Sequence, residues 1–118
     1  MKEVLTRREL SGVQVVILHK RRAGQREAVS KVDQLITTLR EHEFRPLICG
    51  SAEELSTVEF DETIRCVICA GGDGTANAAL EVVGRRAPLL PYPLGNENLL
   101  AKYLGVGANP NACLDRLK

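Results

Sequence analysis

Residues 64–83 read IRCVICAGGDGTANAALEVV, and the rest of the topology follows from their pattern. Residues 64–70 form an apolar run that predicts a β-strand. Residues 71–74 are a glycine-rich loop, and residues 75–83 have the composition of an alanine-rich helix that packs closely on a sheet. A strand that passes through a short glycine loop into a helix is typical of α/β proteins.

The same alternation continues on both sides of this stretch. Residues 13–18 are a β-branched apolar run without clean alternation, as expected of a strand that is covered on both faces. Ser51 with Glu54 three residues later forms a capping-box pattern that begins a helix, and Pro91 and Pro93 place the last strand at an edge or shorten it. Strands are predicted at residues 13–18, 44–49, 64–70 and 88–94. Helices are predicted at residues 25–42, 75–83, 96–104 and 110–117, and a further helix is predicted to begin at Ser51.

The length and composition fit one aliphatic domain. A chain of 118 residues has room for a single core, and that core must be built from 16 Leu, 11 Val and 5 Ile, because the chain holds two Phe, two Tyr and no Trp. Strands that alternate with helices through short connections imply parallel strands with right-handed crossovers. We therefore predict a three-layer, Rossmann-like α/β fold with a mainly parallel sheet.

Charge and composition exclude several function classes. A net charge of +1 gives no electrostatic reason to bind nucleic acid, and the scarcity of aromatic residues removes the stacking platforms of single-strand binders. The clean apolar runs, such as residues 15–18, are far shorter than the roughly 20 residues of a membrane span. The N-terminus mixes both charge signs and has no apolar core, so it is not a signal peptide, and we expect a cytoplasmic protein.

The four cysteines are predicted to be reduced thiols. Cys66 and Cys69 form a C-x-x-C pattern, which is found in redox and zinc sites. On a strand, however, residues three apart point to opposite faces. We therefore predict that both are core residues without a disulfide or a metal.

Three predicted loops meet at the carboxyl edge of the sheet, where ligands bind in such folds: residues 19–24, 71–75 and 94–98. In the second loop, glycines allow the backbone to approach a phosphate closely, and the following helix adds unpaired N–H groups. Asp73 supplies a carboxylate oxygen suited to Mg²⁺. The alternative is a tight turn in which Asp73 is only the N-cap of the helix. The loop is neither a Walker A loop, which needs a lysine, nor a dinucleotide fingerprint, because Asn77 stands at the third glycine position.

Two motifs resemble the diacylglycerol kinase catalytic domain. The first is GGDGTAN at residues 71–77, and the second is PLGNENLLAK at residues 93–102. The superfamily includes sphingosine, ceramide and bacterial lipid kinases, with NAD kinases as distant relatives. The resemblance extends from residue 13 to about residue 117, with both motifs in the family's order at strand ends.

The resemblance implies that ATP and Mg²⁺ are the cofactors and that Asp73 is the catalytic and metal-linked residue. It places the nucleotide contacts at Gly71, Gly72, Asp73, Gly74, Thr75 and Asn77, at Gly95, Asn96 and Asn98, and at His19, Lys20 and Gly24.

The chain also departs from the family pattern. Asn96 and Glu97 stand where the family has threonine and glycine, His19 and Lys20 replace an Asn-Pro pair, and the threonine after the second strand corresponds to Cys49 or Gly50. The basic residues at 19–22 can hold phosphate or form a solvated loop.

The expected function is therefore that of the ATP-binding half of a lipid kinase. Residues 1–118 would be the nucleotide-binding domain, and a second, β-rich domain, absent from this chain, would supply the lipid site. A lipid acceptor implies peripheral contact with a membrane. The alternative is a non-catalytic nucleotide-binding module or pseudokinase. A receiver domain would need acidic residues in place of His19–Lys20, and a dinucleotide oxidoreductase would need the third glycine.

Overall fold

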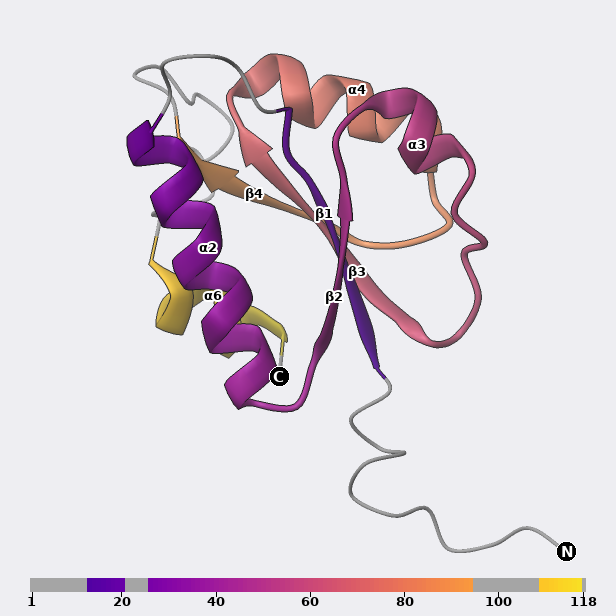
Figure 1. Cartoon of the computed structure of the whole chain (residues 1–118). Helices are drawn as coiled ribbons and strands as arrows, with labels where there is room; N and C mark the ends of the chain where they lie inside the picture. The colour runs from indigo at the N-terminus through magenta and orange to yellow at the C-terminus, as the bar shows by residue number, and fades with distance from the viewer. Residues whose placement is uncertain (1–12, 21–25, 95–108, 118) are drawn as a thin grey trace, which may run out of the picture.

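The computed structural model describes residues 13–20, 26–94 and 109–117, which form an α/β domain (Figure 1). Its strands are β1 (Gln14–Leu18), β2 (Arg45–Cys49), β3 (Ile64–Gly71) and β4 (Leu89–Pro93). Its helices are α2 (Arg26–Glu41), α3 (Ala52–Ser56), α4 (Asp73–Val83) and α6 (Pro110–Leu117). The helix predicted at residues 96–104 lies outside the described residues.

The strands form one sheet in the order β2-β1-β3-β4, and every neighbouring pair is parallel. The predicted Rossmann-like class with a mainly parallel sheet is confirmed. β4 is an edge strand, as its prolines indicated. Leu94 donates its N–H to the carbonyl of Gly71 over 3.2 Å, so the even-numbered residues of this strand face β3. The ring nitrogens of Pro91 and Pro93 therefore face away from the sheet.

The opposite edge strand, β2, also carries a proline at an outward position. Arg45 donates its N–H to the carbonyl of Val13 over 2.9 Å, which shows that Arg45 faces β1. The next residue, Pro46, consequently points its nitrogen outward. A proline is tolerated there because an outward position donates no hydrogen bond to the ladder.

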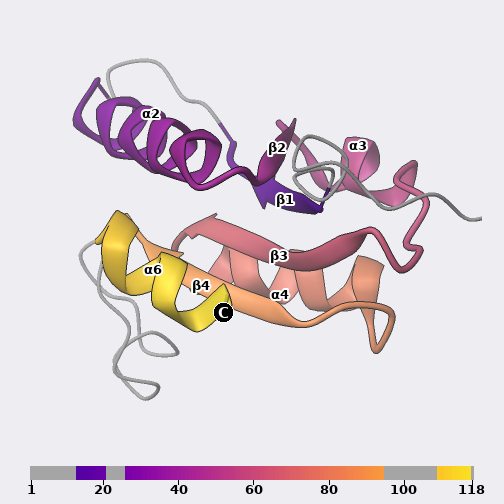
Figure 2. The same ribbon diagram turned by 90° about the horizontal axis from the view of Figure 1, so that it is seen from below.

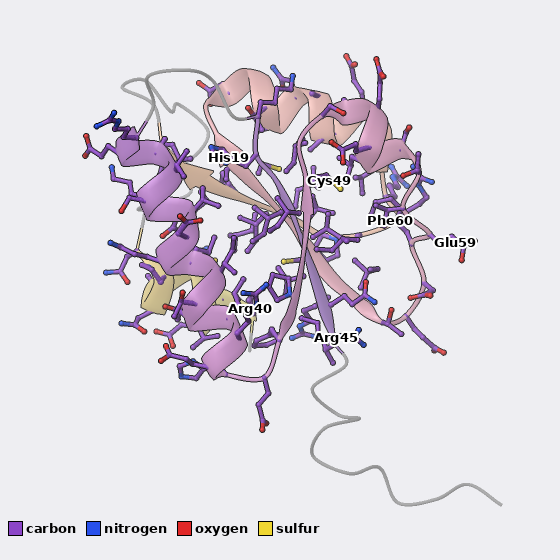
Figure 3. All side chains as sticks on the ribbon, viewed as in Figure 1. His19, Arg40, Arg45, Cys49, Glu59 and Phe60 are labelled. Atoms are coloured by element: carbon purple, nitrogen blue, oxygen red, sulfur yellow. The ribbon has the colours of Figure 1, made fainter. Side chains whose placement is uncertain are left out.

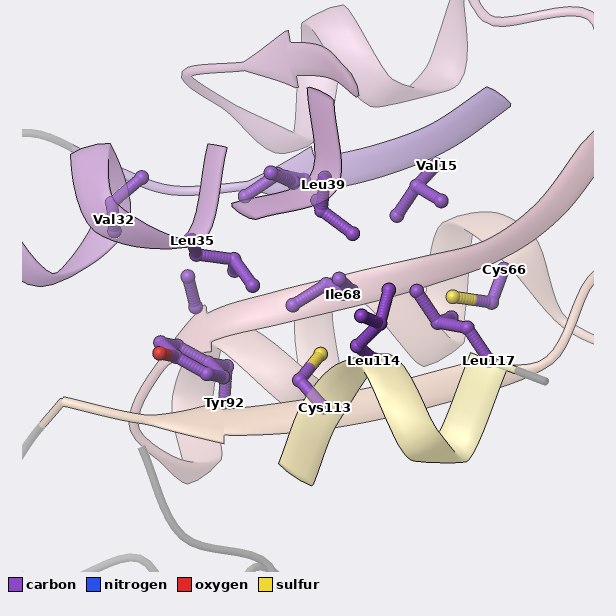
Figure 4. Close-up of a cluster of buried hydrophobic side chains, with 12 residues drawn as sticks. Val15, Val32, Leu35, Leu39, Cys66, Ile68, Tyr92, Cys113, Leu114 and Leu117 are labelled. Carbon is purple, nitrogen blue, oxygen red and sulfur yellow. The ribbon is translucent and has the colours of Figure 1, made fainter. Parts of the chain in front are cut away.

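Two helix layers enclose the sheet (Figure 2). α2 and α6 cover one face, and α3 and α4 cover the other. β1 contributes to both layers. Val15 lies in the cluster beneath α2 and α6 (Figure 4), and Ile17 belongs to the same cluster, whereas Val16 and Leu18 lie beneath α3 and α4. Each of these side chains is fully buried, which is worth about 1.5–3 kcal/mol apiece. The core is aliphatic, as the composition predicted.

The cysteines are core residues. Cys66 lies in the cluster beneath α2 and α6, and Cys69 in the cluster beneath α3 and α4, so the predicted placement on opposite faces is confirmed. All four thiols are free and buried. Burial raises the pKa of Cys66 to about 12, and those of Cys69 and Cys113 to about 11. These thiols are therefore protonated at neutral pH.

α3 and α4 are fixed by local contacts at their ends. Ser51 is the N-cap of α3, and its hydroxyl accepts the N–H of Glu54 over 3.1 Å, which confirms the predicted helix start. α4 ends at Gly84, whose φ of 58° suits glycine and whose N–H donates to the carbonyl of Leu80 over 2.8 Å. Arg86 donates to the carbonyl of Val83 and stacks over the ring of Phe60 at 4.9 Å. Within the described residues, no helix is long and apolar enough to cross a membrane.

Candidate functional site

The strand order places a topological switch point between the carboxyl ends of β1 and β3. The chain runs from β1 outward to β2 and then crosses back past β1 to reach β3. α2 therefore leaves β1 toward one face, whereas α4 leaves β3 toward the other. Ligands bind at such switch points in open α/β sheets. His19 and Lys20 follow β1 at this switch point, and Gly72 and Asp73 follow β3.

α4 begins two residues earlier than the sequence indicated. Its first residue is Asp73, and Gly72 occupies the N-cap position with φ −100° and ψ −166°. The interpretation of Asp73 as the N-cap is therefore wrong, because the extended Gly72 already fills that position. Gly72 has no side chain to accept a hydrogen bond, and its carbonyl receives the N–H groups of Thr75 and Ala76 over 3.2 and 3.3 Å. The N-terminus of α4 thus begins without a side-chain cap.

Gly71 is required by the packing of the helix on the strand. A Cβ added at Gly71 would lie 2.6 Å from Oγ1 and 3.1 Å from Cβ of Thr75. The short, β-branched Thr75 side chain has little freedom to move away. Gly71 therefore lets the first turn of α4 lie directly against the end of β3.

The fold gives no comparable steric reason for a glycine at position 74. Gly74 lies in the first turn of α4 and is exposed, and a Cβ built on it would meet none of the described atoms within 4 Å. The described part of the chain also provides no hydrogen-bond partner for its N–H. Glycine is a poor helix former, about 1 kcal/mol worse than alanine. The space and the N–H at this position are both available to a ligand.

Asp73 can contribute a metal ligand at the same place. It is half-buried in the first turn, where the helix dipole favours a negative charge, and Asn77 follows one turn later on the same face. The described residues contain no group of three or more His, Cys, Asp and Glu side chains able to hold a metal. Mg²⁺ is commonly held by one or two carboxylates together with substrate phosphates and water. The residues present fit a metal that arrives with a nucleotide.

His19 is buried, which corrects the interpretation of the basic segment as a solvated loop at that residue. Only 4% of its surface is exposed, and its backbone N–H donates to the carbonyl of Cys49 over 2.9 Å, which ties the ends of β1 and β2 together (Figure 3). Lys20 is exposed. The basic residues that follow His19 favoured an exposed segment, and the sequence did not indicate that the imidazole would be enclosed.

The two residues that correspond to the family's threonine, Cys49 and Gly50, both have structural roles in the fold. Cys49 is 3% exposed and belongs to the cluster beneath α3 and α4. Burial, and secondarily the charge of Glu54, raises the pKa of its thiol, so it is not an anionic ligand at neutral pH. Gly50 donates its N–H to Oε1 of Glu54 over 3.1 Å. Neither residue replaces the hydroxyl that the family has at this position.

The remaining predicted site residues are Gly24, Gly95, Asn96 and Asn98, and they lie outside the described residues. Leu94, the second residue of the second motif, donates its N–H to the carbonyl of Gly71. The second motif therefore starts beside the glycine loop.

A shallow polar groove of about 440 Å³ lies elsewhere, between α2 and the start of α6. Its lining residues are Ser30, Asp33, Gln34, Thr37, Thr38, Pro110 and Asn111. None of the predicted site residues lines it. Nothing in the sequence pattern indicated this groove, because its two walls are more than 70 residues apart in the chain.

Comparison with known families assigns the chain. Residues 14–118 match the family described as the diacylglycerol kinase catalytic domain. The match spans nearly the whole chain and includes both the glycine loop and the second motif. No curated protein and no solved structure matches the chain. The parallel sheet, the glycine loop at its carboxyl edge and this match lead to one conclusion: the chain belongs to the diacylglycerol kinase catalytic domain family.

Proposed function

We propose that this chain is the nucleotide-binding half of an ATP-dependent lipid kinase. In the proposed reaction, the γ-phosphate of ATP passes to a hydroxyl group of a lipid such as diacylglycerol. Membership in the family supports a phosphotransferase, and ATP with Mg²⁺ are the cofactors that the family implies. A cytoplasmic location with peripheral contact to a membrane is part of the proposal.

The observation that carries the proposal is the open position at Gly74. The described residues give no steric reason for glycine there, and alanine would stabilise the helix. A phosphate at the N-terminus of α4 would need this space, because it contacts backbone N–H groups directly. A glycine that is unfavourable for folding and useful for phosphate binding supports a functional role.

In this proposal, the residues of the glycine loop hold the phosphates through backbone N–H groups and the positive end of the α4 dipole. Asp73 holds Mg²⁺ against the phosphates, and the metal supplies charge neutralisation when it is bound. Asn77 adds an amide donor from the same helix face. Catalysis in such sites comes mainly from positioning and electrostatic stabilisation. The other proposed nucleotide contacts are His19, Lys20, Gly24, Gly95, Asn96 and Asn98.

The acceptor site is proposed to lie in a second, β-rich domain that is not part of these 118 residues. That domain would supply the lipid site and the general base. The 118-residue chain should therefore bind nucleotide but not phosphorylate diacylglycerol. Turnover of diacylglycerol by this chain alone would contradict the need for a second domain.

The test is a calorimetric titration of MgATP into the wild-type chain and the Gly74→Ala variant. We expect the variant to be folded and to bind MgATP at least about tenfold more weakly. The added methyl group would keep the phosphate away from the N–H of residue 74, and one hydrogen bond to a charged group is worth about that much. The matched control is Glu81→Ala, an exposed substitution further along α4. Both variants should melt at or above the wild-type temperature. Unchanged MgATP binding in Gly74→Ala would remove the support that Gly74 gives to the proposal.

A further inference from the structure

The pair Asp73–Gly74 has a chemical property that phosphate binding does not use. The chain contains four aspartates, Asp33, Asp61, Asp73 and Asp115, and only Asp73 is followed by glycine. When glycine follows aspartate, its backbone nitrogen can attack the preceding side-chain carboxyl carbon, because no Cβ shields the approach. The reaction rearranges the backbone through a cyclic imide.

The structure places this pair where the backbone is weakly held. Gly74 is exposed, its N–H has no partner among the described residues, and the N-cap Gly72 provides no side-chain hydrogen bond. Helical backbone angles hold the Gly74 nitrogen away from the carboxyl carbon, so the reaction requires the first turn to open. Helix ends open at little cost, and a glycine in the first turn lowers that cost further.

We infer that Asp73 is a site of spontaneous isoaspartate formation. The Gly74 nitrogen forms a bond to Cγ of Asp73, the nitrogen loses its proton and one carboxyl oxygen leaves, so that one water is released and a succinimide forms. Water then adds to either carbonyl of the ring. One product is the original aspartate, and the other is isoaspartate, in which the backbone runs through the side chain. No oxidant or other reactant is needed.

The consequence for the site depends on the proposed function. If phosphate accepts a hydrogen bond from the Gly74 N–H, the bound nucleotide holds the nitrogen and keeps the turn closed. Nucleotide then protects Asp73 from rearrangement. Isoaspartate inserts an additional backbone carbon into the loop and shifts its carboxylate, so a rearranged chain should lose its Mg²⁺-dependent nucleotide binding. The same residue, Gly74, would therefore allow phosphate to bind and would also allow Asp73 to rearrange when no nucleotide is bound.

The experiment ages the wild-type chain and Gly74→Ala at physiological temperature and neutral pH. Isoaspartate is measured by enzymatic methylation with isoaspartyl methyltransferase and located by peptide mass spectrometry. We expect it to accumulate at position 73 in the wild type and not at Asp33, Asp61 or Asp115, which serve as internal controls. In Gly74→Ala the rate should fall about fivefold from the higher helix propensity of alanine alone, before any shielding by its Cβ. Absence of isoaspartate at position 73, or equal rates in the two proteins, would overturn the inference.

A second arm repeats the ageing with MgATP at ten times its dissociation constant. The rate should then fall about tenfold, in proportion to the fraction of empty sites. Accumulation at position 73 that MgATP does not slow would leave the modification site established and would contradict phosphate binding at Gly74. Failure of this inference and failure of the proposed function are therefore distinguishable.

Discussion

Moderately alkaline pH should destabilise the fold through its buried thiols. Burial raises the pKa of Cys66 to about 12, and those of Cys69 and Cys113 to about 11, from an ordinary value of 9.0. Below pH 9 the thiols are protonated in both the folded and the unfolded chain, so the full contribution of the buried thiols to the free energy of unfolding is present. As the pH rises above 9, only the unfolded chain ionises, and the contribution is lost until the folded pKa is reached. Each group costs about 1.4 kcal/mol per pH unit in this window. The three thiols together should lower the free energy of unfolding by about 4 kcal/mol between about pH 8 and about pH 10.

Urea unfolding at the two pH values, followed by circular dichroism in the presence of a reductant, measures this loss. Cys66→Ala is the matched control, because it removes one titrating group and leaves the other two. The quantity to compare is the loss in free energy of unfolding between the two pH values. In Cys66→Ala this loss should be about one-third smaller than in the wild type, whatever the variant's stability at the lower pH. A wild-type chain whose stability is constant over this range would refute the reasoning, as would a Cys66→Ala variant with the same loss.

Three further predictions follow from single residues. Gly71→Ala should lower the free energy of unfolding by about 1–3 kcal/mol, because the added Cβ would overlap Oγ1 of Thr75. The double variant with Thr75→Ala should recover part of this loss in urea titrations, and a fully stable Gly71→Ala would contradict the packing argument. Asp73→Asn should weaken ATP binding in the presence of Mg²⁺ but not in its absence, as measured by calorimetry, because asparagine lacks the anionic oxygen. Its melting temperature should fall only modestly, because Gly72 is the N-cap and the charge lost from the first turn is worth about 0.3–1 kcal/mol; equal Mg²⁺ dependence in both proteins would leave Asp73 without a metal role. Tyr92→Phe should raise the free energy of unfolding by about 1 kcal/mol, because the described residues give the buried Tyr92 hydroxyl no hydrogen-bond partner. A loss of stability in urea titration would show that this hydroxyl is bonded.

The sequence was sufficient for features that depend on local pattern. The strands and helices follow from apolar periodicity, and most predicted bounds lie within one residue of those in the structure. The edge position of β4 follows from Pro91 and Pro93, which lack backbone donors. The opposite orientation of Cys66 and Cys69 follows from the two-residue repeat of a strand. Each of these inferences needs only neighbouring residues.

Features that depend on three-dimensional contacts or on exact backbone angles were not predictable. His19 is buried, and its N–H donates to the carbonyl of Cys49, a residue of β2 that lies 30 positions further along the chain. The structure is needed to see that packing against Thr75 requires glycine at position 71, whereas no described atom requires it at position 74. The helix start at Asp73 depends on the extended backbone of Gly72, which the glycine-rich composition permits but does not specify.

The outward prolines of the two edge strands bear on how this domain can associate. A strand that adds to a sheet edge needs N–H donors from the edge as well as carbonyl acceptors. On β4, Pro91 and Pro93 remove two of these donors, and on β2 Pro46 removes another. Both margins of the described sheet are therefore poor templates for strand addition, which guards the domain against edge-to-edge aggregation. A second domain or a partner protein would consequently attach through helices and loops, and the sheet would not continue from one unit into the next.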